Sequence, residues 1–303
     1  MVMSMNLGHL AVFHAVAEAK SVSGGAESLL ISQPAVSKQV RLLEQSLGTT
    51  LFERTPRGVI LTEAGAVLAG YARRIFSLEA EAVRALDEIR GLKRGRLAIG
   101  ASTTIGVYLL PEIFVRFRQQ YPEIEASLEV AASRGIEQKL AEGGLDIGFI
   151  ESSTTDDGLR SEQFMSDELA AIVPLNHPLA AKRTVSAEAF CRQPFVVRAT
   201  ASDTGSSVER TLRERGLNVT PTMSLGSTEA IKRSVSAGIG VAIVSHLSIG
   251  MELKARTLAV VRVRGLSISR PLYLLQRRTV GASAAGKALI DLLKSAIAKK
   301  NRA

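Results

Sequence analysis

The sequence predicts a multi-domain α/β protein: a helix-turn-helix with a wing, then one long helix, then two α/β lobes. Three observations lead to this fold class. Two short amphipathic helices fit residues 21–44, an apolar repeat with helical spacing runs from residue 63 to about residue 90, and strand and helix patterns alternate from residue 97 onward. A chain of 303 residues is long enough for two or three domains.

The composition is that of a globular protein with a basic surface. Hydrophobic residues make up 46% of the chain, and the net charge is +9. This charge favours a polyanionic partner or an anionic ligand, although a basic surface without such a partner is the alternative. A single cysteine, Cys191, excludes an intramolecular disulfide. With no bilayer-spanning apolar run and no signal peptide in the sequence, we expect a cytoplasmic protein without membrane contact.

Residues 21–44 are predicted to form two helices joined by a tight turn. The second helix should begin at Ser32, whose hydroxyl can accept amide hydrogens, with Pro34 in the first turn. One face of this helix is apolar, and the other carries Gln33, Ser37, Lys38, Arg41 and Gln45. The arrangement fits a helix-turn-helix whose second helix enters the major groove, but an ordinary helical core would show a similar pattern.

A helix over residues 7–20 is expected to serve as the scaffold of this helix pair. A hairpin is expected after the pair. Residues 51–62 have the pattern of two short strands around a turn that contains Pro56 and Gly58. Arg54 and Arg57 lie at the tip, where a wing would reach phosphate or the minor groove. A solvated hairpin without a partner is the alternative.

From Glu63 to about Arg90, apolar residues alternate at steps of four and three, which is typical of a coiled-coil seam. Its members are Ala64, Leu68, Tyr71, Ile75, Leu78, Ala82, Leu86 and Ile89. A single helix cannot bury this seam, so the pattern predicts a dimer with two recognition helices on two DNA half-sites. The glycine-rich basic segment 91–96 marks a boundary. We expect domains at 1–62, 63–91 and 92–303, with lobe I at about 96–166 and 270–303 and lobe II at about 167–269.

The last domain alternates strands and helices. Strands are expected at 97–101, 124–131, 146–150, 161–165, 169–173, 195–197, 222–225, 241–244, 258–263 and 272–276. Helices are expected at 108–121, 136–142, near Ser186, and at 206–215, 228–237 and 283–299. This order suggests two lobes joined by crossing strands, with a cleft between them.

Ligands of open α/β sheets bind beyond the carboxyl ends of the strands. The candidates at these positions are Ser102, Thr103, Thr104, Glu151, Ser152, Arg198, Thr200, Ser202, Ser227, Thr228 and Ser245. Hydroxyls and amide hydrogens at helix starts suit a small anion, and Arg198 would add a positive charge. Each serine taken alone also fits a plain helix cap.

Several segments closely resemble LysR-type transcriptional regulators, and the resemblance covers essentially the whole chain. It is carried by AESLLISQPAVSKQVRLLEQSLGTTLFER, LTEAG, YLLPEIFVRFRQQYPEIEASL, LDIGFIE and LGSTEAIKRSVSAGIGVAIVS. The resemblance implies a dimer or tetramer that binds double-stranded DNA, and an effector domain similar to periplasmic binding proteins. It implies effector contacts from the candidates above and DNA contacts from Ser32, Gln33, Ser37, Lys38, Arg41, Arg54 and Arg57. An interrupted palindrome is the expected operator, and RNA polymerase is left open as a further partner.

Two details refine the resemblance. ASTTIGVYLLPE and LGSTEAIK are similar to the subgroup linked to carbon fixation or to sulfur and nitrogen assimilation, which favours a small anionic effector. Gly24 and Gly25 stand where the family commonly has a basic or polar residue and an alanine. Two glycines weaken a helix by about 1 kcal/mol each relative to alanine, and they remove a phosphate contact.

Two other classes of protein have to be weighed, since two α/β lobes with a cleft also occur in enzymes and in solute-binding proteins. GIGVA at Gly238 lacks the third glycine of a dinucleotide fingerprint, and Ser245–His246 lacks the nucleophile elbow of hydrolases. The DNA motif and the missing signal peptide oppose a solute-binding protein. We therefore expect no catalytic residue, no metal site and no cofactor.

Overall fold

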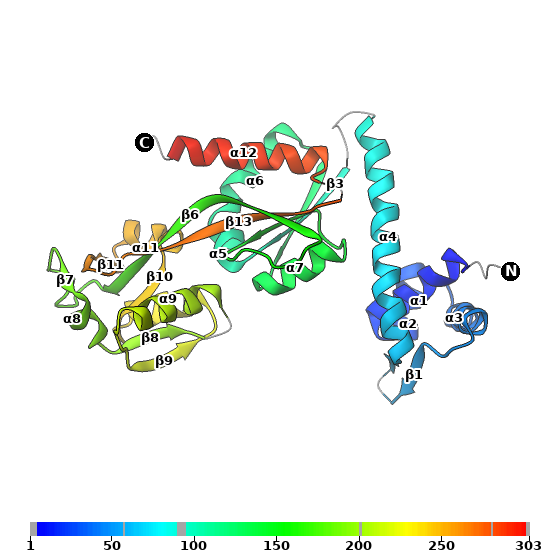
Figure 1. Ribbon diagram of the computed structural model, residues 1–303, viewed down its shortest axis with the longest axis horizontal. Coiled ribbons are helices and arrows are strands. Elements are labelled where there is room, and N and C mark those ends of the chain that lie inside the picture. The colour runs from blue at the N-terminus through cyan, green and yellow to red at the C-terminus, as the bar shows by residue number, and fades with distance from the viewer. Residues whose placement is uncertain (1–4, 57, 90–94, 200–201, 280, 301–303) are drawn as a thin grey trace. The chain divides into compact units, whose positions relative to one another are not determined.

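The structure is a computed structural model that describes residues 5–56, 58–89, 95–199, 202–279 and 281–300. The chain forms two compact units (Figure 1). One comprises residues 1–90 with 142–144, and the other comprises residues 91–141 and 145–303. The predicted multi-domain α/β fold class is confirmed.

The N-terminal unit contains three short helices, a hairpin and one long helix. These are α1 (Leu7–Ala19), α2 (Val22–Leu29), α3 (Gln33–Leu47), β1 (Phe52–Thr55), β2 (Gly58–Leu61) and α4 (Glu63–Ile89). The side chains of Asn6, Ser21 and Ser32 accept amide hydrogens at the starts of α1, α2 and α3. Leu10 and Phe13 of α1 pack against Leu43 of α3 in the core of this unit. The helix-turn-helix elements and the hairpin were therefore predicted correctly.

Gly25 has a packing role that the sequence pattern did not predict. A Cβ atom at Gly25 would lie 2.8 Å from Val16 Cγ2 and 3.0 Å from Val16 Cα, and a Cβ atom at Gly24 would lie 3.0 Å from Ala19 Cβ. Helix α2 therefore lies directly against the backbone of α1, which a larger residue at position 25 would prevent. The close contact between the helices offsets the low helix propensity of the two glycines.

The apolar residues of α4, which include the predicted seam and its neighbours Val67, Ala69, Ala72 and Val83, differ in their burial. Ala64, Leu68 and Ile75 are half-buried against the core of their own unit, together with the buried Ala69 and Ala72. The large apolar side chains of Val67, Tyr71, Leu78 and Val83 are each more than half exposed. The side chains of Leu86 and Ile89 lie outside the described residues. Helix α4 thus leaves apolar side chains uncovered by its own unit, with Val67, Tyr71 and Leu78 along one side of the helix and Val83 on another.

The second unit is built on a seven-stranded sheet. Its strands are β3 (Gly95–Ala101), β4 (Ile124–Val130), β5 (Ile147–Ile150), β6 (Leu159–Pro174), β10 (Ala242–Ser245), β11 (Leu258–Val261) and β13 (Ile268–Arg277). Their order is β10-β6-β13-β5-β3-β4, and β11 also pairs with β6. Strands β3, β4 and β5 are parallel, whereas β13 runs antiparallel to β5 and β6. A bulge interrupts the β6–β13 pairing between Leu272 and Tyr273.

Two small parallel sheets and the helices complete the two lobes. The sheets are β8 (Phe195–Arg198) with β9 (Pro221–Leu225), and β7 (Val185–Ser186) with β12 (Val263–Arg264). The helices are α5 (Thr103–Tyr108), α6 (Leu110–Gln120), α7 (Ser133–Ala141), α8 (Ala187–Cys191), α9 (Asp203–Glu214), α10 (Thr228–Ser236), α11 (Gly250–Ala255) and α12 (Ala284–Lys300). Lobe I has a core around Phe117 and Phe149, and lobe II has one around Phe190 and Phe195. Strands β6 and β13 run from one lobe into the other (Figure 1).

The structure corrects two expectations for the second unit. The separate strands at 161–165 and 169–173 are one continuous strand, β6, because the polar residues between them include Asp167, which is buried and paired inside the sheet region. The helix expected at 108–121 is α6, which begins only at Leu110, and the short helix α5 that precedes it and breaks at Leu109 was not expected. Pro111 explains this break, since the ring of a proline disfavours a continuous helix through the residues before it.

The N-terminal unit should lose stability in mild acid through His14. The imidazole stacks on Phe76 with ring centroids 5.5 Å apart, and burial lowers the pKa of His14; the nearby Glu18 opposes this effect and Arg73 adds to it. The folded state thus favours the neutral ring. The contribution of His14 to the free energy of unfolding is therefore present above the ordinary pKa of 6.5 and is lost as the pH falls below it. His14→Leu should reduce the decrease in the free energy of unfolding between pH 8 and pH 5.5. Urea unfolding followed by circular dichroism measures this decrease. His9→Gln is the control, and an unchanged loss in His14→Leu would contradict the prediction.

Candidate functional site

The polar face of α3 is a surface of the N-terminal unit. Ser32, Gln33, Lys38 and Arg41 are exposed and Ser37 is half-buried, whereas Val36 and Leu43 on the other face are buried. The burial of the apolar face sets the rotation of the helix, so the predicted DNA-contacting side chains lie together on its outer side. This geometry suits insertion of α3 into a groove of DNA.

The hairpin is fixed against the first helix. The amide of Val59 donates to Lys20 O over 3.3 Å, and a Cβ atom at Gly58 would lie only 2.6 Å from that oxygen. Gly58 has φ 135°, a conformation that favours glycine. Arg54 is exposed on β1, whereas the predicted wing residue Arg57 lies outside the described residues.

A buried network of charges occupies the junction of the two lobes. Arg270 on β13 is 2% exposed. Its Nε and Nη2 atoms donate to Asp167 Oδ2 of β6 over 3.0 and 2.9 Å, and Nη1 donates to Glu151 Oε2 at the end of β5. Nη1 also donates to Thr204 Oγ1 over 2.8 Å, and Nη2 to Thr104 Oγ1 over 3.1 Å. One guanidinium thereby joins lobe I, lobe II and both crossing strands.

Two hydroxyls complete this network. Ser102 Oγ donates to Glu151 over 2.9 Å, and Ser245 Oγ donates to Asp167 over 2.8 Å. Burial raises the pKa of Asp167, and the Arg270 charge and the Ser245 hydroxyl act in the opposite direction. Asp167 and Arg270 were missed from the sequence because both lay outside the expected strands, Asp167 between those at 161–165 and 169–173 and Arg270 before the one at 272–276. Neither position directly follows an expected strand, where the effector candidates were sought.

A cavity of about 150 Å³ lies beside this network. Residues from both lobes line it, and six of them were predicted from the sequence: Ser102, Thr103, Thr104, Glu151, Arg198 and Ser202. Ser133 and Asp203, which were not in the predicted set, face each other across the lobes with the Ser133 hydroxyl donating to Asp203 Oδ2 over 2.5 Å. The predicted positions at strand ends are thus brought together from segments far apart in the sequence.

Other predicted effector residues lie outside the lining of this cavity. Ser227 caps α10 by accepting the amide hydrogen of Ala230. Thr228 accepts a hydrogen bond of 2.7 Å from Arg198 Nη1, and Ser245 binds Asp167. Ser152 is half-buried directly after Glu151. Thr200 lies outside the described residues.

The charges around the cavity leave one cation available. Glu151 and Asp167 bind Arg270, and Asp203 binds Ser133. Arg198 donates to the hydroxyl of Thr228, and no carboxylate of the described residues lies within ion-pair distance of it. Ser202 caps α9 by accepting the amide hydrogen of Gly205, and the start of α9 lines the cavity. The arrangement can therefore hold a small polar molecule with a negative group on Arg198.

The two lobes are held together by direct contacts. Tyr108 Oη of α5 donates to Glu229 Oε1 of α10 over 2.7 Å. Lys232, which is buried under this contact, pairs with Glu229 and Glu252 at 2.7 Å each. Together with the Ser133–Asp203 hydrogen bond, the Tyr108–Glu229 hydrogen bond links lobe I directly to lobe II.

Loss of the Arg270 charge should destabilise the protein strongly. Arg270→Met leaves Asp167 and Glu151 buried without their cation, which costs about 3–5 kcal/mol in comparable cases. Chemical denaturation with tyrosine fluorescence measures this loss. Arg278→Met, at an exposed position directly after β13, is the control, and equal stability of both variants would show that the network contributes little.

The matches to known proteins agree with this architecture. Residues 7–66 match the bacterial regulatory helix-turn-helix protein family model of the lysR family, and residues 90–298 match the LysR substrate binding domain. None of the helices that the structure describes is long and apolar enough to cross a membrane.

Relatives and solved structures cover nearly the whole chain. The RuBisCO operon transcriptional regulator of Allochromatium vinosum is 35% identical, over 98% of this chain and 98% of its own. A probable RuBisCO transcriptional regulator of Thalassiosira pseudonana is 36% identical, over 91% and 92%.

Among solved structures, full-length OxyR of Pseudomonas aeruginosa has a TM-score of 0.77 at 22% identity, covering 97% of this chain and 95% of its own. The regulatory domain of Synechocystis CcmR in complex with 2-PG has a TM-score of 0.62 at 26% identity, covering 67% and 97%. The resemblance predicted from the sequence is thereby confirmed. The chain belongs to the LysR family of DNA-binding transcriptional regulators, in which an effector-binding domain, and not a catalytic domain, follows the helix-turn-helix.

Proposed function

We propose that this regulator responds to a small anionic metabolite that binds in the cavity between the lobes. The observation that carries the proposal is Arg198, a cation at a hydroxyl-lined cavity whose neighbouring carboxylates already have partners. The similarity to the CcmR regulatory domain, which was solved with 2-PG, and to regulators of RuBisCO supports an acid of carbon metabolism. The protein would act in the cytoplasm, where its DNA is located.

On DNA, the proposal assigns base contacts and phosphate contacts to different residues of α3. Gln33 and Ser37 are short polar side chains suited to base edges, and Lys38 and Arg41 are cations suited to phosphate. Arg54 and Arg57 would add wing contacts beside the recognition helix. Ser32 caps the start of α3 by accepting the amide hydrogen of Ala35. The first amides of the helix would then lie close to the backbone of DNA.

A homodimer through α4 is the assembly that fits these contacts. The exposed Val67, Tyr71 and Leu78, which share one side of α4, would be buried in such a pair, since a soluble protein rarely leaves a row of large apolar side chains uncovered. Two copies would present two α3 helices to an interrupted palindrome. The proposal keeps the domain boundaries at 1–62, 63–91 and 92–303.

Arg41→Ala should weaken operator binding about equally for all sequences and lower the salt dependence by roughly one phosphate contact. Electrophoretic shift titrations at several salt concentrations measure both quantities and also the number of protomers per duplex. Arg118→Ala, an exposed arginine of α6, is the matched control. Unchanged binding by Arg41→Ala, or a complex with one protomer, would contradict the proposed reading of DNA.

Arg198→Met should weaken binding of 2-PG about tenfold to a hundredfold, since a hydrogen bond to a charged group contributes about 1.5–3 kcal/mol. Titration calorimetry on the full chain measures this change. Arg192→Met, an exposed arginine after α8, is expected to bind as the unchanged protein does. Equal affinities in both variants would remove Arg198 from the site, and no binding to the unchanged protein would reject 2-PG as a ligand.

A further inference from the structure

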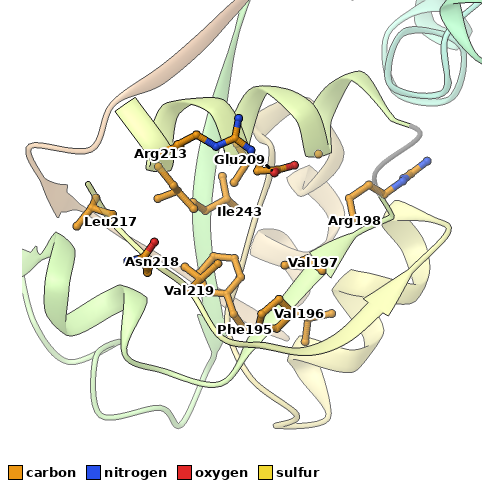
Figure 2. Close-up of a pocket in the computed structure, with 14 residues that line it drawn as sticks. Phe195, Val196, Val197, Arg198, Glu209, Arg213, Leu217, Asn218, Val219 and Ile243 are labelled. Atoms are coloured by element: carbon orange, nitrogen blue, oxygen red, sulfur yellow. Dashed lines mark hydrogen bonds and ion pairs between the residues drawn. The ribbon is translucent and has the colours of Figure 1, made fainter. Parts of the chain in front are cut away.

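Lobe II contains a second pocket, separate from the cavity between the lobes. Its volume is about 390 Å³, more than twice that of the other cavity. It lies between α9, β8, the start of β9 and β10 (Figure 2). Of its lining residues, Arg198 is the one that also lines the cavity between the lobes, and Figure 2 shows its side chain at one end, pointing away from the pocket.

The walls of this pocket are apolar. They are formed by Phe195, Val196, Val197, Val208, Leu212 and Ile243, with Val219 from the segment before β9. Phe195 and Ile243 also belong to the lobe II core, so the base of the pocket is continuous with that core. A partly open pocket of this volume with mainly apolar walls falls within the range of small-molecule sites.

Polar groups occur at the edge of the pocket. Glu209 and Arg213 lie together on α9 with Arg213 Nη2 bonded to Glu209 Oε1 over 2.5 Å, and Asn218 lies on the other side (Figure 2). Both members of the pair are exposed to solvent. A guanidinium has five N–H donors, so this single bond to Glu209 leaves others for a ligand.

We propose that this pocket binds an amphipathic acid, with a hydrocarbon chain or ring against the apolar walls and a carboxylate at Arg213. At about 30 Å³ for each water-sized group, the pocket has room for roughly ten non-hydrogen atoms. An apolar body gains affinity by leaving water, and the charge at the edge selects an anion. The inference goes beyond the proposed function, because it concerns a different cavity and a different class of ligand.

Helix α9 connects the two sites. Asp203 and Thr204 in its first turn line the cavity between the lobes, where Asp203 accepts from Ser133 and Thr204 accepts from Arg270. Val208 and Leu212, one and two turns later, line the lobe II pocket. A ligand that moves or stiffens α9 therefore alters the lobe contacts, and the two ligands change each other's affinity by the same factor.

Titration calorimetry of the full chain with octanoate, butyrate and 1-octanol tests the site. Octanoate should bind once per protomer and on the order of a hundredfold tighter than butyrate, since each of its four additional methylenes adds about fourfold in affinity when buried. Val208→Phe fills the pocket and should weaken octanoate at least tenfold, whereas Val115→Phe on the exposed side of α6 should not. Arg213→Gln should weaken octanoate but leave 1-octanol unchanged.

Two further variants decide where octanoate binds. Thr104→Val, in the cavity between the lobes, should leave octanoate affinity unchanged. If Thr104→Val loses octanoate while Val208→Phe keeps it, the ligand binds between the lobes and the inference is overturned, as it is by a lack of saturable binding. Should Val208→Phe lower the thermal midpoint of unfolding, Val219→Phe on the facing wall provides the same test.

Discussion

The effector domain depends on one buried cation, Arg270. A guanidinium removed from water needs carboxylate partners and further hydrogen bonds, and these partners come from four separate segments of the chain. Glu151 and Thr104 belong to lobe I, Thr204 belongs to lobe II, and Asp167 lies on the strand between them. Because every one of these groups must reach the same point, the network constrains how the lobes can lie around the cavity that it borders.

The sequence predicted the parts of this protein that are governed by local rules. Ser32 caps α3 where the pattern placed a helix start, and the hairpin forms around Gly58 as expected. Six candidate effector residues meet at one cavity because strand ends on one edge of a sheet are close in space. What local rules could not predict is a pairing such as Arg270 with Asp167, across 103 positions, between two residues in the middle of strands.

Gly25 shows the same limit on the DNA-binding side. Its low helix propensity is visible in the sequence, but the Val16 backbone that lies against it is visible only in the folded unit. The lobe II pocket is a further case. Its walls come from α9 and from strands that each have an ordinary apolar pattern, so no motif marks it, whereas the hydroxyls of the other cavity follow strand ends and could be recognised.

The continuity of β6 has a mechanical consequence. Two lobes joined by flexible linkers can rotate freely relative to each other. These lobes instead share one 16-residue strand, β6, which is paired with β13 along ten residues. A change in the angle between the lobes must therefore be taken up as twist of this two-stranded ribbon, and the bulge between Leu272 and Tyr273 is the place where the pairing is already irregular. The paired strands therefore limit how freely the two lobes can turn relative to each other.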